Sequence, residues 1–323
     1  MNQSNQPIAI FGGTGHYGTK IVQSLLAKGE PVRVLSRNAA KARQILGDEP
    51  QIIEGNLTSR DDIVQTLAGA RAVIIAVSAW TWHSIKQIKE IERDAVLTIF
   101  AEAKSAGIDR VIYLSGYDMR EGVVQELNLL KFGEIKLEIE RTLRESDFNW
   151  TILGCAPSME LLFAFVRNGK MMVPGGGPPA VPTVNRNDVG EIVAQAVLRN
   201  DLSGQRFRLT GPEALSFPEV AKRIGDITGQ PVRFRKIPLL PLNVATLVMW
   251  PFNPYPRYIY WSVKLLNNFP QDLAQRVPED HQYLRDTFDY TPTTFEMEAR
   301  ERFGEKTIQR VNESANQGIG QPS

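Results

Sequence analysis

The residues FGGTGHYG at positions 11–18 constrain the fold more than any other part of the sequence. They follow a short apolar run at 8–11, which suits a buried strand, and they precede an amphipathic helical pattern that ends at Gly29. Two glycine spacings, GxGxxG and GxxGxxG, overlap in this segment through Gly12, Gly13, Gly15 and Gly18. Glycine is needed where a strand turns sharply into a helix and where backbone approaches a diphosphate. The segment therefore predicts a dinucleotide site.

Strand and helix patterns alternate through the first half of the chain. Further strands are expected at 31–37, 51–55, 71–77, 109–116 and 149–154, with helices at 39–46, 59–69, 85–106 and 130–145. This alternation predicts an α/β fold, a Rossmann-type doubly wound parallel sheet. The carboxyl ends of its strands would share one edge, where such sheets bind ligands.

The alternation becomes irregular after residue 155. We predict an NADP-binding Rossmann domain over 1–155 and a smaller mixed C-terminal lobe over 156–310, built over the edge of the sheet. The last residues, 311–323, are polar and contain glycine, and they predict a flexible tail.

The glycine turn also supplies most of the expected cofactor contacts. Unpaired N–H groups at the start of a helix, with the positive end of its dipole, attract phosphate. Contacts are predicted for Gly12, Gly13, Thr14, Gly15, His16, Tyr17 and Gly18. The alternative for this segment is a tight strand–helix turn that binds nothing.

The choice between NADP and NAD is expected at the end of the second strand. NAD sites usually place Asp or Glu there, to accept a hydrogen bond from the ribose. Here the strand ends in Ser36 and Arg37, which can bind a 2′-phosphate by charge-assisted hydrogen bonds. We therefore predict NADP, used as NADPH. The alternative is that Arg37 is a solvated surface charge.

Composition excludes several classes of function. The chain has 37 basic and 36 acidic residues, a net charge of +1, and this gives no reason to expect nucleic acid as a partner. One cysteine, Cys155, excludes an intramolecular disulfide, and the three histidines lie too far apart in sequence to suggest a metal site. No signal peptide or transmembrane segment is visible, so the expected location is cytoplasmic.

Beyond the glycine turn, several segments resemble one known family. They are EGNLTSRDDI, ERDAVLTIFAEAKSAGIDRVIYLSG, KLEIERTLRESDFNWTIL and the block from VNRNDVGEIV to DITGQPV. Over roughly residues 7–240 the sequence resembles the atypical short-chain dehydrogenase/reductase superfamily, in its NmrA-like, NAD(P)H-binding branch. The resemblance implies a monomer, with further cofactor contacts from Asn56, Leu57, Ala76, Val77, Ser78, Lys136 and Pro157.

The chain departs from that family at the usual catalytic tyrosine. Many members carry Tyr-x-x-x-Lys, whereas the corresponding residues here are Phe132 and Lys136, and phenylalanine cannot donate a proton. By resemblance, the catalytic candidates are Lys136 and Ser115, with Tyr117 as the nearby phenol that could replace the missing acid. The alternatives are an exposed Lys136 that bridges to Glu140, a Ser115 that caps loop backbone, and a Cys155 that is a small core thiol.

Residues 250–261 are dense in aromatic residues and proline. This composition suits an interface with a protein, with a membrane surface or with a large planar ligand. The alternatives are a lid over the pocket and ordinary packing of the second lobe. A peripheral membrane contact is thus left open.

Two functions follow from these observations. The first is an NADPH-dependent reductase that transfers hydride to a small or medium hydrophobic substrate without the usual tyrosine. The second is a non-catalytic NADP(H)-binding protein, either a redox sensor or an accessory or assembly protein for an electron-transfer complex.

Overall fold

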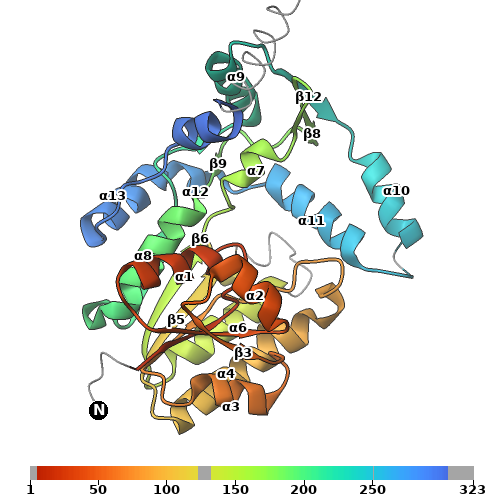
Figure 1. The fold of residues 1–323 in the computed structure, drawn as a ribbon. Coiled ribbons are helices and arrows are strands. Elements are labelled where there is room, and N and C mark those ends of the chain that lie inside the picture. Colours follow the sequence, from red (N-terminus) through yellow and green to blue (C-terminus); the bar gives the residue numbers. More distant parts are fainter. Residues whose placement is uncertain (1–5, 123–131, 250, 305–323) are drawn as a thin grey trace, which may run out of the picture.

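A computed structural model of the chain describes residues 6–122, 132–249 and 251–304 (Figure 1). Its centre is a seven-stranded parallel sheet in the order β10-β6-β5-β4-β1-β2-β3. The strands are β1 (Ile8–Phe11), β2 (Val32–Ser36), β3 (Gln51–Glu54), β4 (Ala72–Ile75), β5 (Arg110–Gly116), β6 (Asn149–Cys155) and β10 (Gln205–Leu209). The α/β Rossmann-type fold predicted from the sequence is confirmed.

Helices cover both faces of this sheet (Figure 1). They are α1 (Gly18–Ala27), α2 (Ala39–Leu46), α3 (Arg60–Leu67), α4 (Ala95–Ser105), α6 (Phe132–Arg144) and α8 (Arg186–Leu198). Side chains alternate along β1: Ile8 and Ile10 join the core under α1 and α8, whereas Ala9 and Phe11 join the core under α3, α4 and α6. This alternation is the reason that a run of four apolar residues was readable as a strand buried on both faces.

The helix expected over 85–106 is interrupted. A 3₁₀ turn at Ile85–Gln87 and a π-helical turn at Glu90–Asp94 precede α4. The interruption accompanies the inward placement of Glu92, whose side chain is fully buried. π-Helical turns are frequent at functional sites.

The chain after residue 155 contributes to both parts of the molecule. β10 extends the main sheet beside β6, and α8 packs against α1. The helices approach closely at Gly190, where a Cβ atom would lie 2.8 Å from the Lys20 backbone. The irregularity of the sequence after residue 155 thus conceals one more strand and one more helix of the Rossmann core.

The remaining elements form the second lobe. Its strands are β7 (Val166–Arg167), β8 (Lys170–Pro174), β9 (Val181–Pro182), β11 (Ala214–Leu215) and β12 (Arg233–Ile237), and its helices are α7 (Glu160–Phe163), α9 (Phe217–Thr228), α10 (Leu240–Met249), α11 (Tyr255–Asn267), α12 (Gln271–Gln275) and α13 (Val277–Thr287). β12, β8 and β7 make a small mixed sheet, while β9 pairs with β11. The predicted tail, 311–323, lies outside the described residues.

The helices α10 and α11 extend to one side of the second lobe (Figure 1). Within the part of the chain that the structure describes, every helix is too short or too polar to span a bilayer.

Candidate cofactor and substrate site

Three of the four glycines of the first turn are each required by a close neighbour. Gly12 has a φ of +90°, and a Cβ atom there would overlap the Ala76 carbonyl at the end of β4. At Gly13 a Cβ atom would lie 2.8 Å from Val34 Cγ1 of β2, and at Gly18 it would overlap the Gly12 carbonyl. Larger residues would therefore push the turn away from the strand ends and from the helix that begins at Gly18.

The amides of this turn can receive a diphosphate. The Gly15 N–H donates to the Gly12 carbonyl at 2.9 Å and closes the turn. The N–H groups of Thr14, His16, Tyr17 and Gly18 have no acceptor among the described residues. Four unpaired donors at a helix start provide the geometry and the positive potential that phosphate oxygens need. The turn thus fits the group that the sequence predicts for it.

At the adenosine end, Arg37 is exposed and has no hydrogen bond or ion pair to the rest of the described chain. The Ser36 hydroxyl donates to the Asn38 carbonyl at 3.2 Å. The second strand has no carboxylate at this end, but Glu54 of β3 lies beside it. Glu54 is opposite Ser36 in the strand register, and its side chain accepts from the Ala39 N–H at 3.2 Å. Glu54 was not predicted from the sequence because it belongs to the third strand, and only the pairing of β3 with β2 places it at this strand end.

The loop after β3 is held by its own side chains. Asn56 Oδ1 accepts from the Thr58 N–H at 3.1 Å, and the Asn56 N–H donates to Asp62 at 2.7 Å. Leu57 packs against the core beneath α3 and α4. One carbonyl lone pair and the amide group of Asn56 therefore remain for an adenine nearby.

The segment after β4 lies directly against the glycine turn. The Ala76 N–H donates to the Phe11 carbonyl at 2.8 Å, which continues the pairing of β4 with β1 beyond the last strand residue. Val77 is buried and Ser78 is exposed. The three predicted contacts Ala76, Val77 and Ser78 thus lead away from the phosphate turn toward Trp80.

Lys136 lies on α6 and is only 4% exposed. Its Nζ atom lies 3.2 Å from Glu92 Oε2, 5.0 Å from the Tyr113 ring centre and 5.6 Å from the Phe132 ring centre. Burial alone would lower the pKa of Lys136, but the Tyr113 hydroxyl and the Glu92 carboxylate outweigh burial and hold that pKa above its ordinary value. Lys136 is therefore a buried cation at neutral pH.

The alternative of an exposed Lys136 bridging to Glu140 is wrong. Glu140 is itself buried and pairs with Arg206 of β10 and with Arg144, each at 3.0 Å. Arg206 also donates to the carbonyls of Gly116 and Tyr117. The i+4 spacing gave the wrong partner because Arg206 of β10 forms the ion pair with Glu140.

Glu92 is the residue of this site that sequence reasoning missed. Its Oε1 atom accepts from the Ala79 N–H at 2.7 Å, and its Oε2 atom faces Lys136. The carboxylate thus ties the loop after β4 to α6. No local pattern pointed to it, since 44 residues separate Glu92 from Lys136.

Several buried polar atoms around this pair lack a hydrogen-bond partner in the described residues. Neither Ser115 Oγ nor Trp80 Nε1 has a hydrogen-bond partner in the described residues. Alternation along β5 places Ser115 on the same face of the sheet as Tyr113, whose ring lies beneath Lys136. Buried donors of this kind are normally satisfied, so the two atoms fit a bound cofactor or substrate. Ser115 does not cap loop backbone.

The Tyr117 hydroxyl is not brought together with Lys136. It donates to Asp280 of α13 at 3.1 Å, and the ring packs in the core under α1 and α8. Arg208 holds the same carboxylate at 2.7 and 2.8 Å. Burial, followed by the charge of Asp280, raises the pKa of Tyr117 well above its ordinary value. Its hydroxyl is thus committed to the second lobe.

Cys155 remains a thiol at neutral pH. Burial raises its pKa to about 12, although Lys136 and Arg206 act in the opposite direction. Its sulfur makes a long contact of 3.9 Å with the Leu153 carbonyl. The small core thiol considered from the sequence agrees with these surroundings.

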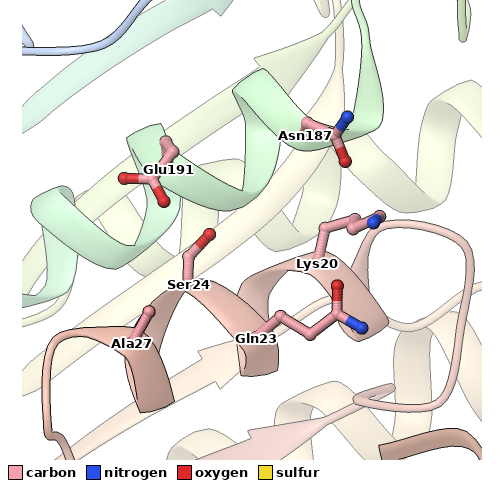
Figure 2. A pocket seen from close by; sticks show the side chains of 6 residues that line it. All are labelled: Lys20, Gln23, Ser24, Ala27, Asn187 and Glu191. Atoms are coloured by element: carbon pink, nitrogen blue, oxygen red, sulfur yellow. The ribbon is translucent and has the colours of Figure 1, made fainter.

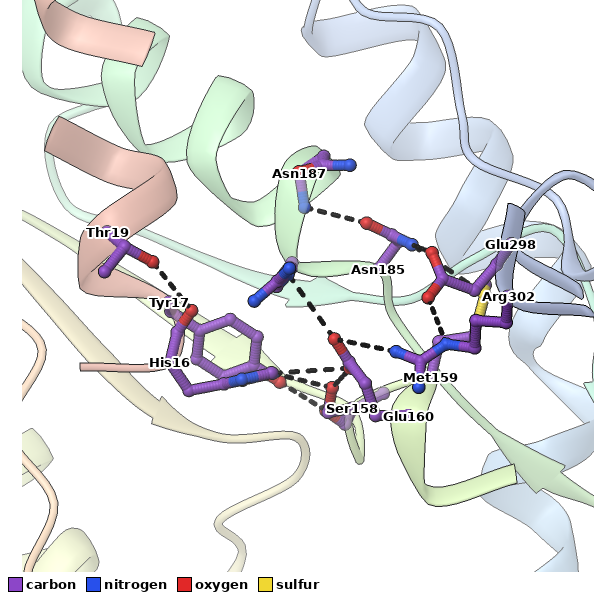
Figure 3. A network of polar contacts seen from close by, with 12 residues as sticks. His16, Tyr17, Thr19, Ser158, Met159, Glu160, Asn185, Asn187, Glu298 and Arg302 are labelled. Carbon is purple, nitrogen blue, oxygen red and sulfur yellow. Dashed lines mark hydrogen bonds and ion pairs between the residues drawn. The ribbon is translucent and has the colours of Figure 1, made fainter. Parts of the chain in front are cut away.

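The glycine turn is linked to the second lobe through the residues after β6 (Figure 3). His16 Nε2 lies 2.8 Å from Ser158 Oγ and 3.4 Å from Glu160, and the Tyr17 hydroxyl donates to the Ala156 carbonyl at 3.4 Å. The Pro157 carbonyl between them accepts from the Val184 N–H at 3.0 Å. The predicted contact Pro157 is therefore held close to the phosphate turn.

Glu160 is the centre of this network. It also pairs with Arg186 at 3.5 Å and with Arg302 at 3.6 Å. Burial alone would raise the pKa of Glu160, but hydrogen bonds from His16 and Ser158 outweigh burial and lower it to about 2. The carboxylate is therefore charged at neutral pH and balanced by cations from two lobes.

A groove of about 260 Å³ runs between α1 and α8 (Figure 2). It is lined by Lys20, Gln23, Ser24, Ala27, Asn187 and Glu191. None of the residues predicted to bind cofactor or substrate lines it. In the described ranges, no group of three or more acidic, histidine or cysteine side chains is placed to hold a metal ion.

Comparison with known proteins agrees with this geometry. The chain is 27% identical over 236 residues to an NAD(P)H azoreductase of Xenophilus azovorans, covering 72% of this chain and 77% of the relative. It is 22% identical over 298 residues to the photosystem II assembly factor Ycf39 of Trieres chinensis, covering 88% and 86%. The triphenylmethane reductase of Citrobacter sp. complexed with NADP(H) shares the fold with a TM-score of 0.71, at 16% identity, covering 91% of this chain and 99% of that one.

A family model described as NAD(P)H-binding matches residues 12–200, from the glycine turn to the end of α8. This range includes the unpaired amides of the turn, the Glu92–Lys136 pair and Ser115. Relatives at 24% and 26% identity are NmrA-like family domain-containing oxidoreductases of Malbranchea aurantiaca and Aspergillus flavus, which confirms the resemblance to NmrA-like proteins. The chain therefore belongs to the NAD(P)H-binding family.

Proposed function

We propose that this protein is an NADPH-dependent reductase that transfers hydride to a small or medium-sized hydrophobic acceptor. The observation that carries the proposal is the buried Lys136 ammonium, held by Glu92 on the same sheet face as the unpartnered Ser115 hydroxyl. A buried cation beside a free donor can stabilise negative charge that develops on an acceptor.

Different residues would bind different parts of the cofactor. The amides of Thr14, His16, Tyr17 and Gly18 receive the diphosphate, and the Arg37 guanidinium receives the 2′-phosphate that distinguishes NADPH from NADH. NADPH, when bound, supplies the hydride from its nicotinamide ring.

Aromatic side chains surround the Lys136 end of the site. The Phe132 ring meets Trp80 edge to face at 4.9 Å, and Trp80 meets Tyr258 of α11 at 5.7 Å. Such walls exclude water and favour an apolar or aromatic acceptor. They also strengthen the electrostatic effect of Lys136 because the local dielectric constant is low.

Phe132 in place of the usual tyrosine narrows the acceptor class. Reduction of an aldehyde produces an alkoxide, which needs an acid at the site, whereas a quinone, an azo compound or a conjugated enone produces an anion that is delocalised. Ser115 can donate a hydrogen bond to such an anion, and Lys136 can balance its charge. The azoreductase relative supports the same class of acceptor.

The test measures NADPH oxidation with quinones, azo dyes, enones and aldehydes under anaerobic conditions. Lys136→Met should lower the rate about a hundredfold or more, because it removes the cation beside the developing charge. The affinity for NADPH, measured by calorimetry, should change much less. Lys89→Met is the matched control: it makes the same substitution at an exposed lysine in the segment before α4 that also contains Glu92. A protein that oxidises NADPH with none of these acceptors is not the reductase proposed here.

A second candidate is a non-catalytic NADP(H)-binding protein that senses redox state or assists the assembly of an electron-transfer complex. Phe132 and the relationship to assembly factors over 88% of the chain favour it. In that case NADPH binds with the Arg37-dependent preference, no acceptor is reduced, and Lys136→Met changes affinity or stability only.

A further inference from the structure

We propose that α10 and Phe252, three residues beyond the end of this helix, form a docking face for the surface of an anionic lipid membrane. The face consists of Leu240, Val244, Ala245, Val248 and Phe252. This proposal concerns a surface outside the cofactor site and does not depend on the reductase activity.

The docking face is apolar and exposed. Leu240, Val244, Val248 and Phe252 are 69%, 51%, 63% and 72% exposed, respectively. Residues at intervals of four lie along one side of a helix, so Leu240, Val244 and Val248 form a continuous stripe on α10. Ala245, next to Val244 in the helix, is also exposed. No charged residue occurs between Ile237 and Pro256. Water therefore meets an uninterrupted apolar stripe at the far end of the second lobe (Figure 1).

The charged residues of the segment that carries this face have one sign. Residues 227–271 contain five basic side chains and no acidic one: Arg233, Arg235, Lys236, Arg257 and Lys264. The whole chain carries only +1, so the remaining residues are net negative. Arg233, Arg235 and Lys236 are exposed on β12, immediately before α10. An apolar stripe flanked along the chain only by cations matches anionic lipid, which offers hydrocarbon and a negative headgroup layer together.

The length of α10 determines its orientation relative to a bilayer. Its ten residues extend about 15 Å, half of the roughly 30 Å that a spanning helix must cross. Trp261 of α11, with Lys264 4.8 Å above its ring, adds the aromatic and basic pairing that is common at the headgroup level. The helix therefore suits a position in the plane of the interface.

The docking face is continuous with the roof of the cofactor site. From Phe252 the chain turns into α11, whose Tyr255 meets Trp82 at 5.8 Å and whose Tyr258 meets Trp80. The Asn253 side chain also donates to the Trp82 carbonyl at 3.1 Å. If the proposed reductase function holds, on which this last step rests, a lipid-soluble acceptor would enter from the bilayer beneath this roof.

The experiment is flotation of the full chain with vesicles of phosphatidylcholine alone and of phosphatidylcholine and phosphatidylglycerol in equal parts. The wild type should float with the anionic vesicles, and Val244→Glu/Val248→Glu should lower its partition coefficient at least about tenfold. Val64→Glu/Met297→Glu, which places the same charges on other exposed apolar positions, is the matched control and should float as the wild type does. Arg235→Gln/Lys236→Gln should weaken binding to the anionic vesicles and reduce its salt dependence.

Three results would overturn the proposal. One is a wild type that floats no better than Val244→Glu/Val248→Glu, and another is an equal loss in the matched control. The third is a concentration-dependent dimer, seen by sedimentation and abolished by Val244→Glu/Val248→Glu, with no vesicle binding, because a second copy would then occupy the face. NADPH affinity, measured on each variant, verifies folding. Vesicle binding requires no turnover, so it can fail or succeed separately from the reductase proposal.

Discussion

The Lys136 ammonium and the Glu92 carboxylate form an ion pair of 3.2 Å, and their side chains are only 5% and 1% exposed. Each charge is compensated by the other at this depth, and an isolated buried charge would be very unfavourable. The pair also joins the loop after β4 to α6, through the Ala79 N–H. Lys136 acts in the proposed chemistry, and Glu92 is the residue that positions it.

Glu92→Gln should therefore reduce stability and change the pH profile together. Removing one member of a buried pair costs about 3–5 kcal/mol in unfolding free energy, which urea denaturation can measure. The wild-type pKa of Lys136 is held above the ordinary lysine value of 10.5, so the contribution of this pair to stability is complete below that pH and is lost as the pH rises through the folded-state pKa. In Glu92→Gln that pKa should fall, and the alkaline loss of NADPH oxidation should begin at lower pH.

Glu90→Gln is the control for this change, since Glu90 is exposed in the same π-helical turn. The double variant Glu92→Gln/Lys136→Met should recover part of the lost stability, because no unpaired charge remains. A Glu92→Gln protein with wild-type stability and an unchanged pH profile would show that the pair does not hold Lys136.

Tyr117→Phe should affect stability rather than rate. The hydroxyl donates to Asp280, and losing one such hydrogen bond to a charged group costs about 1.5–3 kcal/mol. Thermal unfolding and NADPH oxidation should be measured on the same preparation. A large loss of rate with normal stability would restore Tyr117 as the replacement for the missing phenol.

Arg37→Ala should weaken NADPH binding about tenfold or more, with little effect on NADH, because the guanidinium meets only the 2′-phosphate. Glu54→Gln should strengthen NADPH binding slightly, since its carboxylate lies beside the same strand end. Arg43→Ala on the exposed side of α2 is the control. Titration calorimetry with both nucleotides tests the three variants, and an Arg37→Ala protein that still prefers NADPH contradicts the assignment.

Asp188→Asn should make the free energy of unfolding depend less on pH between about pH 4 and 6. Burial raises the pKa of Asp188 to about 6, against hydrogen bonds from Thr293 that act to lower it. The folded state thus binds a proton more tightly than the unfolded state does, so this group's contribution to stability falls as the pH rises from about 4 to 6. The expected range is about 3 kcal/mol. Unfolding free energies of Asp188→Asn and of the exposed Asp226→Asn, measured across this window, should differ accordingly.

The sequence predicted the parts of the fold that depend on local signals. The helices expected at 39–46 and 59–69 are examples, and in the structure they begin at local side-chain caps: Asn38 accepts from the Lys41 N–H and Ser59 from the Asp62 N–H. The glycine turn was predictable because Gly12 and Gly18 lie so close to neighbouring backbone, and Gly13 so close to Val34, that a Cβ atom would not fit. Lys136 was found by resemblance, whereas its burial was not foreseen, because Glu140 offered a local partner at i+4.

Parts that depend on distant contacts were not predictable. Glu92, Arg206 and Glu54 acquire their roles from residues on helices and loops distant in sequence, and no spacing in the sequence records those contacts. The expected helix over 85–106 followed from apolar periodicity, which cannot show that a carboxylate must be turned inward. The segment of β10 is a short run between loops, and only the open edge of β6 identifies it as a strand of the main sheet.

The position of β10 has a consequence for synthesis of the protein. Its backbone covers the edge of β6, and α8 supplies Val189, Ile192, Val193 and Val197 to the core over α1. A nascent chain that has left the ribosome only as far as residue 155 has neither, so it presents an open strand edge and a bare apolar surface. The nucleotide-binding half should therefore aggregate when produced alone, and a truncation that ends after β10 should be the shortest soluble version of it.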